Sequence, residues 1–213
     1  MRTLLTSSLL LLSLPAVAVE FDVSGKISTL GIGVEVSKPL PANFALRAGV
    51  NTLNYEYDDT INEIDYESDL KLRSVAGYLD WRPFASPFRL TGGLVYNQNE
   101  ITGVGAADGT YTLDGVTFNA ADVGTLSGNV GFDTVAPYVG LGFNVPVAPT
   151  FRISFDAGVL FQGEPQVDLS ADGAIASDPR FIQALEAEER DFQEEVEDFE
   201  LFPVLSIGLS KRF

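Results

Sequence analysis

The chemistry available to this chain is mainly that of carboxylates. Its 213 residues include 30 Asp and Glu, 13 Lys and Arg, no His and no Cys. Carboxylates can bind Ca²⁺ or Mg²⁺, and a suitably spaced pair can hydrolyse glycosides. A serine nucleophile lacks its usual histidine base here, and without cysteine neither thiolate metal sites nor disulfides can form. With 30 carboxylates, pairs at a suitable spacing arise by chance, so finding one is no evidence of catalysis. We therefore predict that the protein is not an enzyme and uses no cofactor.

The densest acidic segment lies between Glu56 and Asp69. It contains seven acidic residues and no basic one, namely Glu56, Asp58, Asp59, Glu63, Asp65, Glu67 and Asp69. Such oxygen ligands could collect Ca²⁺ or Mg²⁺, so divalent cations are a weak partner prediction. The segment lacks the D-x-D-x-D-G pattern of an ordered calcium loop. Its composition therefore favours a solvated loop that keeps the surface soluble and repels like charges.

Charged residues also occur where they alternate with apolar neighbours along the chain. Six of them form the candidate interior network: Glu35, Arg47, Asp80, Arg89, Arg152 and Asp156. Alternation places them on the face opposite the apolar side chains. One interpretation is a set of ion pairs that neutralise one another and fill an interior. The alternative is an arginine-lined constriction that selects anions.

The elements that would position these groups are β-strands. Seven segments alternate between apolar and polar or small residues, with ranges 27–37, 43–56, 69–82, 87–99, 133–144, 150–162 and 201–213. In the clearest of them, Ile153 and Phe155 face one way while Arg152 and Asp156 face the other. Each segment is about as long as a tilted membrane strand requires, roughly ten residues.

The connections favour a membrane barrel over a soluble β-sandwich, which would alternate as well. Short connections (38–42, 83–86 and 144–148) take turns with long ones (57–68, 100–132 and 163–200). Membrane barrels have this arrangement, with short turns on one side and long loops on the other. The alternation slips within 69–82, which predicts either a β-bulge or a section that stands above the membrane.

The chain ends in an alternating strand with a terminal aromatic residue. Its predicted assembly-signal residues are Leu205, Ile207, Leu209 and Phe213. This end resembles the last strand of bacterial outer-membrane β-barrels, which the insertion machinery reads as a signal. Lys211 departs from that pattern, since the family usually has an apolar or aromatic residue there. The runs 33–40 and 136–143 look like parts of the small OmpA/OmpW-type barrels.

The resemblance implies an all-β fold, an antiparallel transmembrane β-barrel of eight strands. It implies a Gram-negative bacterial outer membrane as the location, with outer-membrane lipid and the barrel assembly machinery as partners. It transfers no catalytic residue. An even strand number requires one strand more than the seven found, and we predict that residues 19–26 supply it. The rival segment, 165–170, also alternates, but its use would invert the loops or break closure.

The beginning of the chain predicts export. A basic Arg2, an apolar stretch from Leu4 to Leu14 and a small-x-small pattern ending at Ala18 indicate a signal peptide, 1–18. The mature domain is then 19–213, with a formal charge of 12 − 30 = −18 after loss of Arg2. That charge argues against nucleic acid as a partner.

Two long connections contain local structure signals. Asp114-Gly115 between alternating runs predicts a hairpin, and residues 119–123 a helical turn. Asp178 followed by Pro179 predicts the start of one amphipathic helix. The apolar face of that helix is predicted to be Phe181, Leu185, Phe192, Val196 and Phe199. With ten acidic residues from Asp178 to Glu200, the helix is expected to act as a lid or partial plug, or alternatively as a docking face for a protein.

We therefore predict an outer-membrane β-barrel of structural or surface-interaction type with a side-chain-filled lumen. A narrow, porin-like diffusion channel for small solutes is the first alternative. The second is a surface receptor or adhesin that acts through the long external loops.

Overall fold

The structure is a computed structural model that describes residues 20–61, 64–83, 86–107 and 109–213. The predicted signal peptide, 1–18, lies outside these residues and stays a prediction, together with the boundary of the mature domain.

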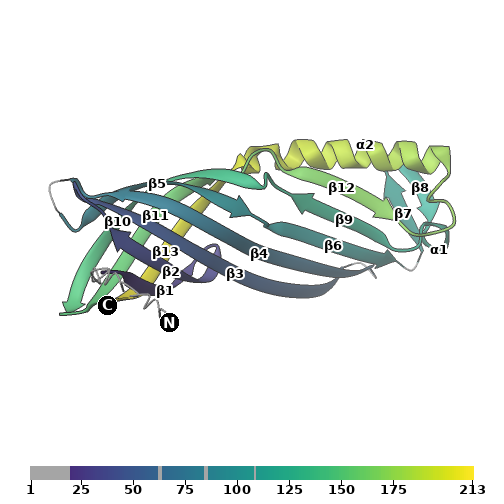
Figure 1. Ribbon diagram of the computed structural model, residues 1–213. Helices are drawn as coiled ribbons and strands as arrows, with labels where there is room; N and C mark the ends of the chain where they lie inside the picture. The colour runs from purple at the N-terminus through teal and green to yellow at the C-terminus, as the bar shows by residue number, and fades with distance from the viewer. Residues whose placement is uncertain (1–19, 62–63, 84–85, 108) are drawn as a thin grey trace, which may run out of the picture.

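Eight antiparallel strands close into a barrel (Figure 1). Around the barrel they follow the order β1-β2-β3-β4-β5-β10-β11-β13, and β13 pairs with β1. The strands are β1 (Asp22–Ser28), β2 (Gly31–Pro39), β3 (Phe44–Ile61), β4 (Ile64–Trp81), β5 (Phe88–Asn97), β10 (Val135–Ala148), β11 (Phe151–Phe161) and β13 (Leu201–Arg212). Closure pairs both edges of each strand within the barrel, which a sheet in lipid requires. The predicted eight-stranded, all-β barrel is confirmed.

The first strand lies close to the predicted position, but the turn that follows it was missed. The segment predicted as one strand, 27–37, is divided between β1 and β2 by a turn at Thr29 and Leu30. β2 begins at Gly31, where φ is 99° and a Cβ would lie 2.4 Å from the carbonyl oxygen of Thr52. Only glycine fits this conformation and this close approach.

Strands β3 and β4 continue beyond the barrel, so the prediction of a loop at 57–68 was wrong. They pair without a register shift along their whole length, so the bulge expected within 69–82 is absent from this pair. The structure instead has the predicted alternative, in which the beginning of this segment stands above the rest of the barrel. The sequence pattern slips because Leu70 and Leu72 line an apolar space there, whereas Asp80 faces the polar lumen.

A separate folded part, which we call the head, extends from the long strands β3 and β4 (Figure 1). Its sheet continues from β4 through β6 (Glu100–Ala107) and β9 (Leu126–Gly131) to β12 (Gln166–Ala171). The rival first strand, 165–170, is thus a strand, but it belongs to the head. The other head elements are β7 (Thr110–Leu113), β8 (Val116–Asn119), α1 (Ala120–Val123), α2 (Pro179–Val196) and the 3₁₀ turn η2 (Glu197–Glu200).

The local signals in the long connections are borne out. Asp114 and Gly115 have φ of 45° and 72° and form the tight turn between β7 and β8. The Asn119 side chain accepts a hydrogen bond from the Ala121 amide and caps α1. Asp178 accepts one from the Arg180 amide at 2.8 Å and caps α2, with proline in the first turn. These outcomes follow from local turn and capping chemistry alone.

Three short turns, those that follow β2, β4 and β10, lie at the end of the barrel opposite the head, beside the C-terminus (Figure 1), whereas the turn at Thr29 and Leu30 lies at the head end. One of them differs from the prediction. Residues 144–148 belong to β10, and the turn itself is Pro149-Thr150. The β10–β11 register shifts between Pro146 and Ala148, because proline has no amide hydrogen for the ladder.

The barrel is apolar outside and polar inside. Exposed large apolar side chains cover the outer face of the strands, while most of the buried polar residues belong to strands and point inward. Near the turn end, Phe44 and Trp81 stack with ring centroids 6.5 Å apart. No helix among the described residues is long and apolar enough to cross a bilayer.

Replacing Phe155, which faces outward near the middle of β11, tests the assignment of faces. We expect Phe155→Arg to lower the free energy of unfolding by about 2–4 kcal/mol if the site lies near the bilayer midplane. Urea titration of the protein folded in lipid vesicles measures the change, with Phe155→Leu as the matched control. Equal stability of the two variants would show that this face does not contact lipid.

Candidate functional site

A layer of buried charges fills the barrel near the turn end. Its members, which we call the charge layer, are Lys26, Glu35, Arg47, Asp80, Arg89 and Asp156. They come from six strands, each at an inward position. Five were predicted from the sequence, and the structure brings these five together. All six residues are less than 10% exposed.

Arg47 is the centre of this layer. Its guanidinium donates to both carboxylate oxygens of Asp80, at 3.1 Å each, and to Glu35 at 3.0 and 3.2 Å. Lys26 donates to the same Glu35 at 2.6 Å, and Arg89 donates to Asp156. Planar guanidinium groups suit such forked pairing with carboxylates.

The charges of the layer balance. Three basic residues, Lys26, Arg47 and Arg89, face three acidic ones, Glu35, Asp80 and Asp156. A buried charge without a partner is costly, so a neutral set is the arrangement that a narrow interior tolerates. The layer therefore acts as a cross-link among six strands.

Arg152 is the predicted network residue that lies elsewhere. It pairs with Asp22 at 2.7 Å, nearer the turn-end mouth. Sequence reasoning missed both Asp22 and Lys26 as interior residues. The signal was present, since Asp22, Ser24 and Lys26 alternate with Val23, Gly25 and Ile27, but the strand is short and its start was uncertain.

Two tyrosines cover the charge layer on its head side. The rings of Tyr78 and Tyr138 meet edge to face with centroids 5.1 Å apart. Both residues are cross-strand partners of Gly93, and a Cβ on Gly93 would lie 2.5 Å from the Tyr78 ring. The Arg47 guanidinium lies 4.5 Å from the Tyr78 ring centroid, so the ring also contacts the cation beneath it.

Above the tyrosines the lumen is closed by apolar side chains. Val95, Ala136 and Leu160 have no exposed surface, and Leu30 and Val204 have almost none. Below the charge layer, the interior cavity has a volume of only about 20 Å³, enough for about one water molecule. The lumen is therefore filled by three successive layers: charged, aromatic and apolar.

A larger apolar cavity lies between the barrel and the head. Its volume is about 280 Å³, and its walls come from β4, β6, β9, α2, η2, β13 and neighbouring connections. Leu72, Val130 and Val196 are typical wall residues. Asn99 and Gln162 are the polar residues that line it, and no charged side chain in the described part of the chain does so.

The predicted apolar face of α2 is divided between two places. Phe181 and Leu185 pack in the core of the head, where the Phe181 ring lies 5.2 Å from that of Phe118. Phe192, Val196 and Phe199 line the apolar cavity. α2 lies along β12 and does not enter the barrel.

Polar side chains of α2 cover the β12 edge of the head sheet. Gln193 accepts a hydrogen bond from the Val167 amide at 3.1 Å, and Glu189 accepts one from the Leu169 amide at 3.0 Å. β12 is the last strand of the sheet, so these amides would otherwise be free to pair with another chain. Two polar residues of this strongly acidic helix thus protect a sheet edge.

Comparison with known proteins was made by family model, by sequence and by structure. No family model and no curated protein matches the chain. The crystal structure of Acinetobacter baumannii CarO2 superposes with a TM-score of 0.61 at 21% identity, over 92% of this chain and 99% of that one. A. baumannii CarO gives a TM-score of 0.58 at 19% identity, over 90% and 97%. This is the fold of a small outer-membrane β-barrel.

In this outer-membrane barrel fold, the C-terminal strand presents its predicted signal residues outward. They are Leu205, Ile207, Leu209 and Phe213. The Phe213 ring stacks on Phe21 at 5.4 Å, and the Lys211 ammonium lies 4.7 Å from its centroid. The atypical lysine thus has a local contact, while recognition by the assembly machinery stays a prediction.

The acidic segment 56–69 is the predicted site for divalent cations. Most of its carboxylates lie outside the described side chains, and the described residues contain no cluster of three or more metal-ligating groups. Divalent cation binding there stays a prediction.

Removing the central cation tests the charge layer. Arg47→Gln leaves Glu35 and Asp80 undercompensated, so we expect it to lower the free energy of unfolding of this barrel by about 3–5 kcal/mol. Urea unfolding followed by the single tryptophan, Trp81, measures this. Arg73→Gln, at an exposed arginine, is the matched control. Adding Glu35→Gln to Arg47→Gln restores neutrality and should recover part of the loss; no recovery would show that the pairs are not coupled.

Proposed function

We propose that the protein is an outer-membrane barrel with a closed lumen, which serves as a scaffold that displays the head at the cell surface. The observation that supports this most directly is the filled interior. Charged, aromatic and apolar layers follow one another across the barrel, and the space left beside the charges holds about one water molecule.

The orientation of the scaffold follows from its two ends. Outer-membrane barrels have short turns on the periplasmic side and longer segments outside. The turns that follow β2, β4 and β10 share one end with the C-terminus, and the head occupies the other, where the β1–β2 turn also lies (Figure 1). The head is therefore proposed to be external and the turns periplasmic.

A diffusion channel would require an open path through these layers. An ion entering from the turn end would have to displace the Arg47–Asp80 and Arg89–Asp156 pairs, and then separate the two tyrosine rings. Each step disrupts buried contacts that an open pore would not contain.

Single-channel recording of the refolded mature protein in a planar bilayer tests the closed lumen. We expect no discrete conductance steps from protein whose gel shift shows that it has folded, because the layers leave no continuous water path. A porin refolded in the same way confirms that the assay detects channels. Reproducible steps that change in Arg47→Gln would instead establish the charge layer as the constriction of a channel.

The apolar cavity beneath α2 favours a second candidate function, a surface receptor for a small hydrophobic molecule. Its volume of about 280 Å³ approaches the lower limit for ligand pockets, and it is too small for a polypeptide segment with side chains. Its walls are almost entirely apolar.

The charges around this cavity select against anions. An adjoining hollow shares Pro165 with it and is lined by Asp133 and Glu164.

 

Between Pro179 and Val196, α2 contains six acidic residues and two basic ones, a formal charge of 2 − 6 = −4. Like charges repel, so this acidic surrounding disfavours an anionic ligand. The occupant proposed for the cavity is therefore a small, uncharged hydrophobic molecule.

A pair of naphthalene probes that differ in charge tests this receptor function. We expect neutral 2-methylnaphthalene to shift the methyl NMR signals of Leu72 and Val130 in a saturable way, and anionic 2-naphthoate to do so more weakly. Val196→Trp fills the cavity and should abolish the shifts, whereas Ile182→Trp, on the same helix but outside the cavity, should preserve them. Shifts confined to outward methyl groups such as those of Leu209 would indicate partition into detergent and contradict the receptor.

A further inference from the structure

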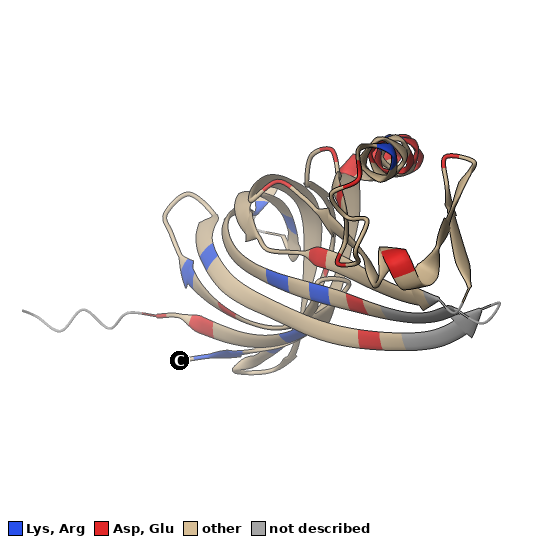
Figure 2. Cartoon of the chain, turned by 90° about the vertical axis from the view of Figure 1, so that its right-hand side faces the viewer, with Lys and Arg blue, Asp and Glu red and all other residues tan. Residues whose placement is uncertain are grey.

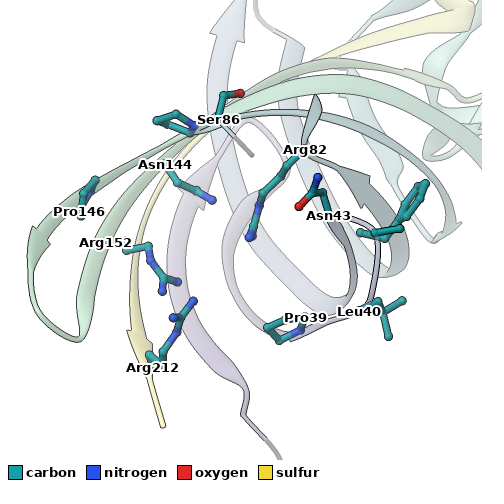
Figure 3. A pocket seen from close by; sticks show the side chains of 12 residues that line it. Pro39, Leu40, Asn43, Arg82, Ser86, Asn144, Pro146, Arg152 and Arg212 are labelled. Atoms are coloured by element: carbon teal, nitrogen blue, oxygen red, sulfur yellow. The ribbon is translucent and has the colours of Figure 1, made fainter. Parts of the chain in front are cut away.

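The turn-end mouth of the barrel forms a vestibule of about 530 Å³ (Figure 3). Three arginines line it: Arg82 just after β4, Arg152 on β11 and Arg212 at the end of β13. Figure 3 shows the three side chains directed into the same hollow. Asn43 and Asn144 add neutral polar groups to its wall.

A count of charges through the lumen singles out Arg82. The charge layer is balanced, with three basic and three acidic residues. Nearer the mouth, Arg152 and Arg212 share two carboxylates, those of Asp22 and Glu20. Within the described residues, Arg82 forms no ion pair, so the mouth carries one unmatched positive charge.

The surroundings of Arg82 are unfavourable for an isolated cation. Its Nε is buried and has no hydrogen-bond partner among the described residues. Burial lowers the pKa of the Arg82 guanidinium, and the positive charge of Arg89 lowers it further, while the carboxylate of Asp80 offsets only part of this effect. A group in this position gains from any anion that enters the vestibule.

The rest of the chain makes this cationic site unusual. The formal charge of the protein is −17. Figure 2 shows the barrel strands carrying most of the basic residues, while acidic residues dominate the head. An anion would therefore be repelled by the head end and attracted at the turn-end mouth.

We propose that the vestibule binds a phosphate group, with Arg82 as the principal contact and Arg152 and Arg212 as supporting contacts. Guanidinium groups bind phosphate oxygens through paired, charge-assisted hydrogen bonds. The site is independent of the apolar cavity and of the proposed display function. The phosphate could belong to a free solute or to a lipid headgroup at the rim, and the experiment separates these sources.

Binding of inorganic phosphate to the refolded full mature chain in a zwitterionic detergent is the first measurement. Isothermal titration calorimetry should show saturable binding that weakens as salt concentration rises. Arg82→Gln should reduce the affinity by about tenfold, because a hydrogen bond to a charged group is lost. Arg73→Gln, an exposed arginine at the head end, is the matched control and should leave the affinity unchanged.

A second variant distinguishes a binding role from a structural one. Asp22→Asn removes a carboxylate that occupies both Arg152 and Arg212, so it should raise the affinity for phosphate several-fold. A residue that merely stabilises the mouth would not produce an increase. Unchanged affinity in both Arg82→Gln and Asp22→Asn, in protein shown to be folded by gel shift, would overturn the proposal.

Nanodiscs separate the two sources of phosphate. If a lipid headgroup is the ligand, wild-type protein should retain anionic phosphatidylglycerol in preference to phosphatidylcholine, and Arg82→Gln should lose that preference. If a free solute is the ligand, inorganic phosphate should bind equally well in both lipids. Absence of phosphate binding in detergent together with no lipid preference would refute the site altogether.

Discussion

The width of an eight-stranded barrel is the constraint on which the rest of this structure depends. Such a barrel leaves an interior that side chains fill. Every inward residue must then match its neighbours in size and charge. Gly93 accordingly lies where Tyr78 and Tyr138 meet, and Gly142 lies where a Cβ would approach Arg89 and Asp156 within 2.7 Å. The barrel is closed because large and charged residues face glycines across the strands.

The sequence was informative where local rules decide the outcome. Alternation revealed the barrel strands, and Asp178 with Pro179 revealed the start of α2, since each depends on near neighbours. The far ends of β3 and β4 could not be predicted, because acidic turn-like residues there form regular strands. Leu70 and Leu72 made the alternation look as if it slipped by one residue. In fact they face the same interior as Asp80, and that interior changes from polar to apolar along the strand, which an alternation pattern does not show.

The sequence predicted which charged residues face the lumen better than it predicted which of them pair with one another. Arg47, Asp80 and Glu35 could be assigned to the inner face, but Lys26 depends on a first strand of seven residues whose boundaries the sequence leaves open. Arg82 lies one residue beyond β4, where alternation ends, so no periodic signal marked it. Charge pairing depends on strand register, and register is a property of the closed barrel.

The two ends of the molecule carry opposite charge. At the head, acidic side chains remain solvated, and Glu189 with Gln193 also covers the backbone edge of β12. At the turn end, arginines gather where carboxylates are too few to match them. The charge layer that fills the lumen between these two regions is neutral. The acidic head and the cationic mouth are therefore separated by an interior that carries no net charge. A closed barrel can therefore present an acidic surface on one side of the membrane and a cationic hollow on the other.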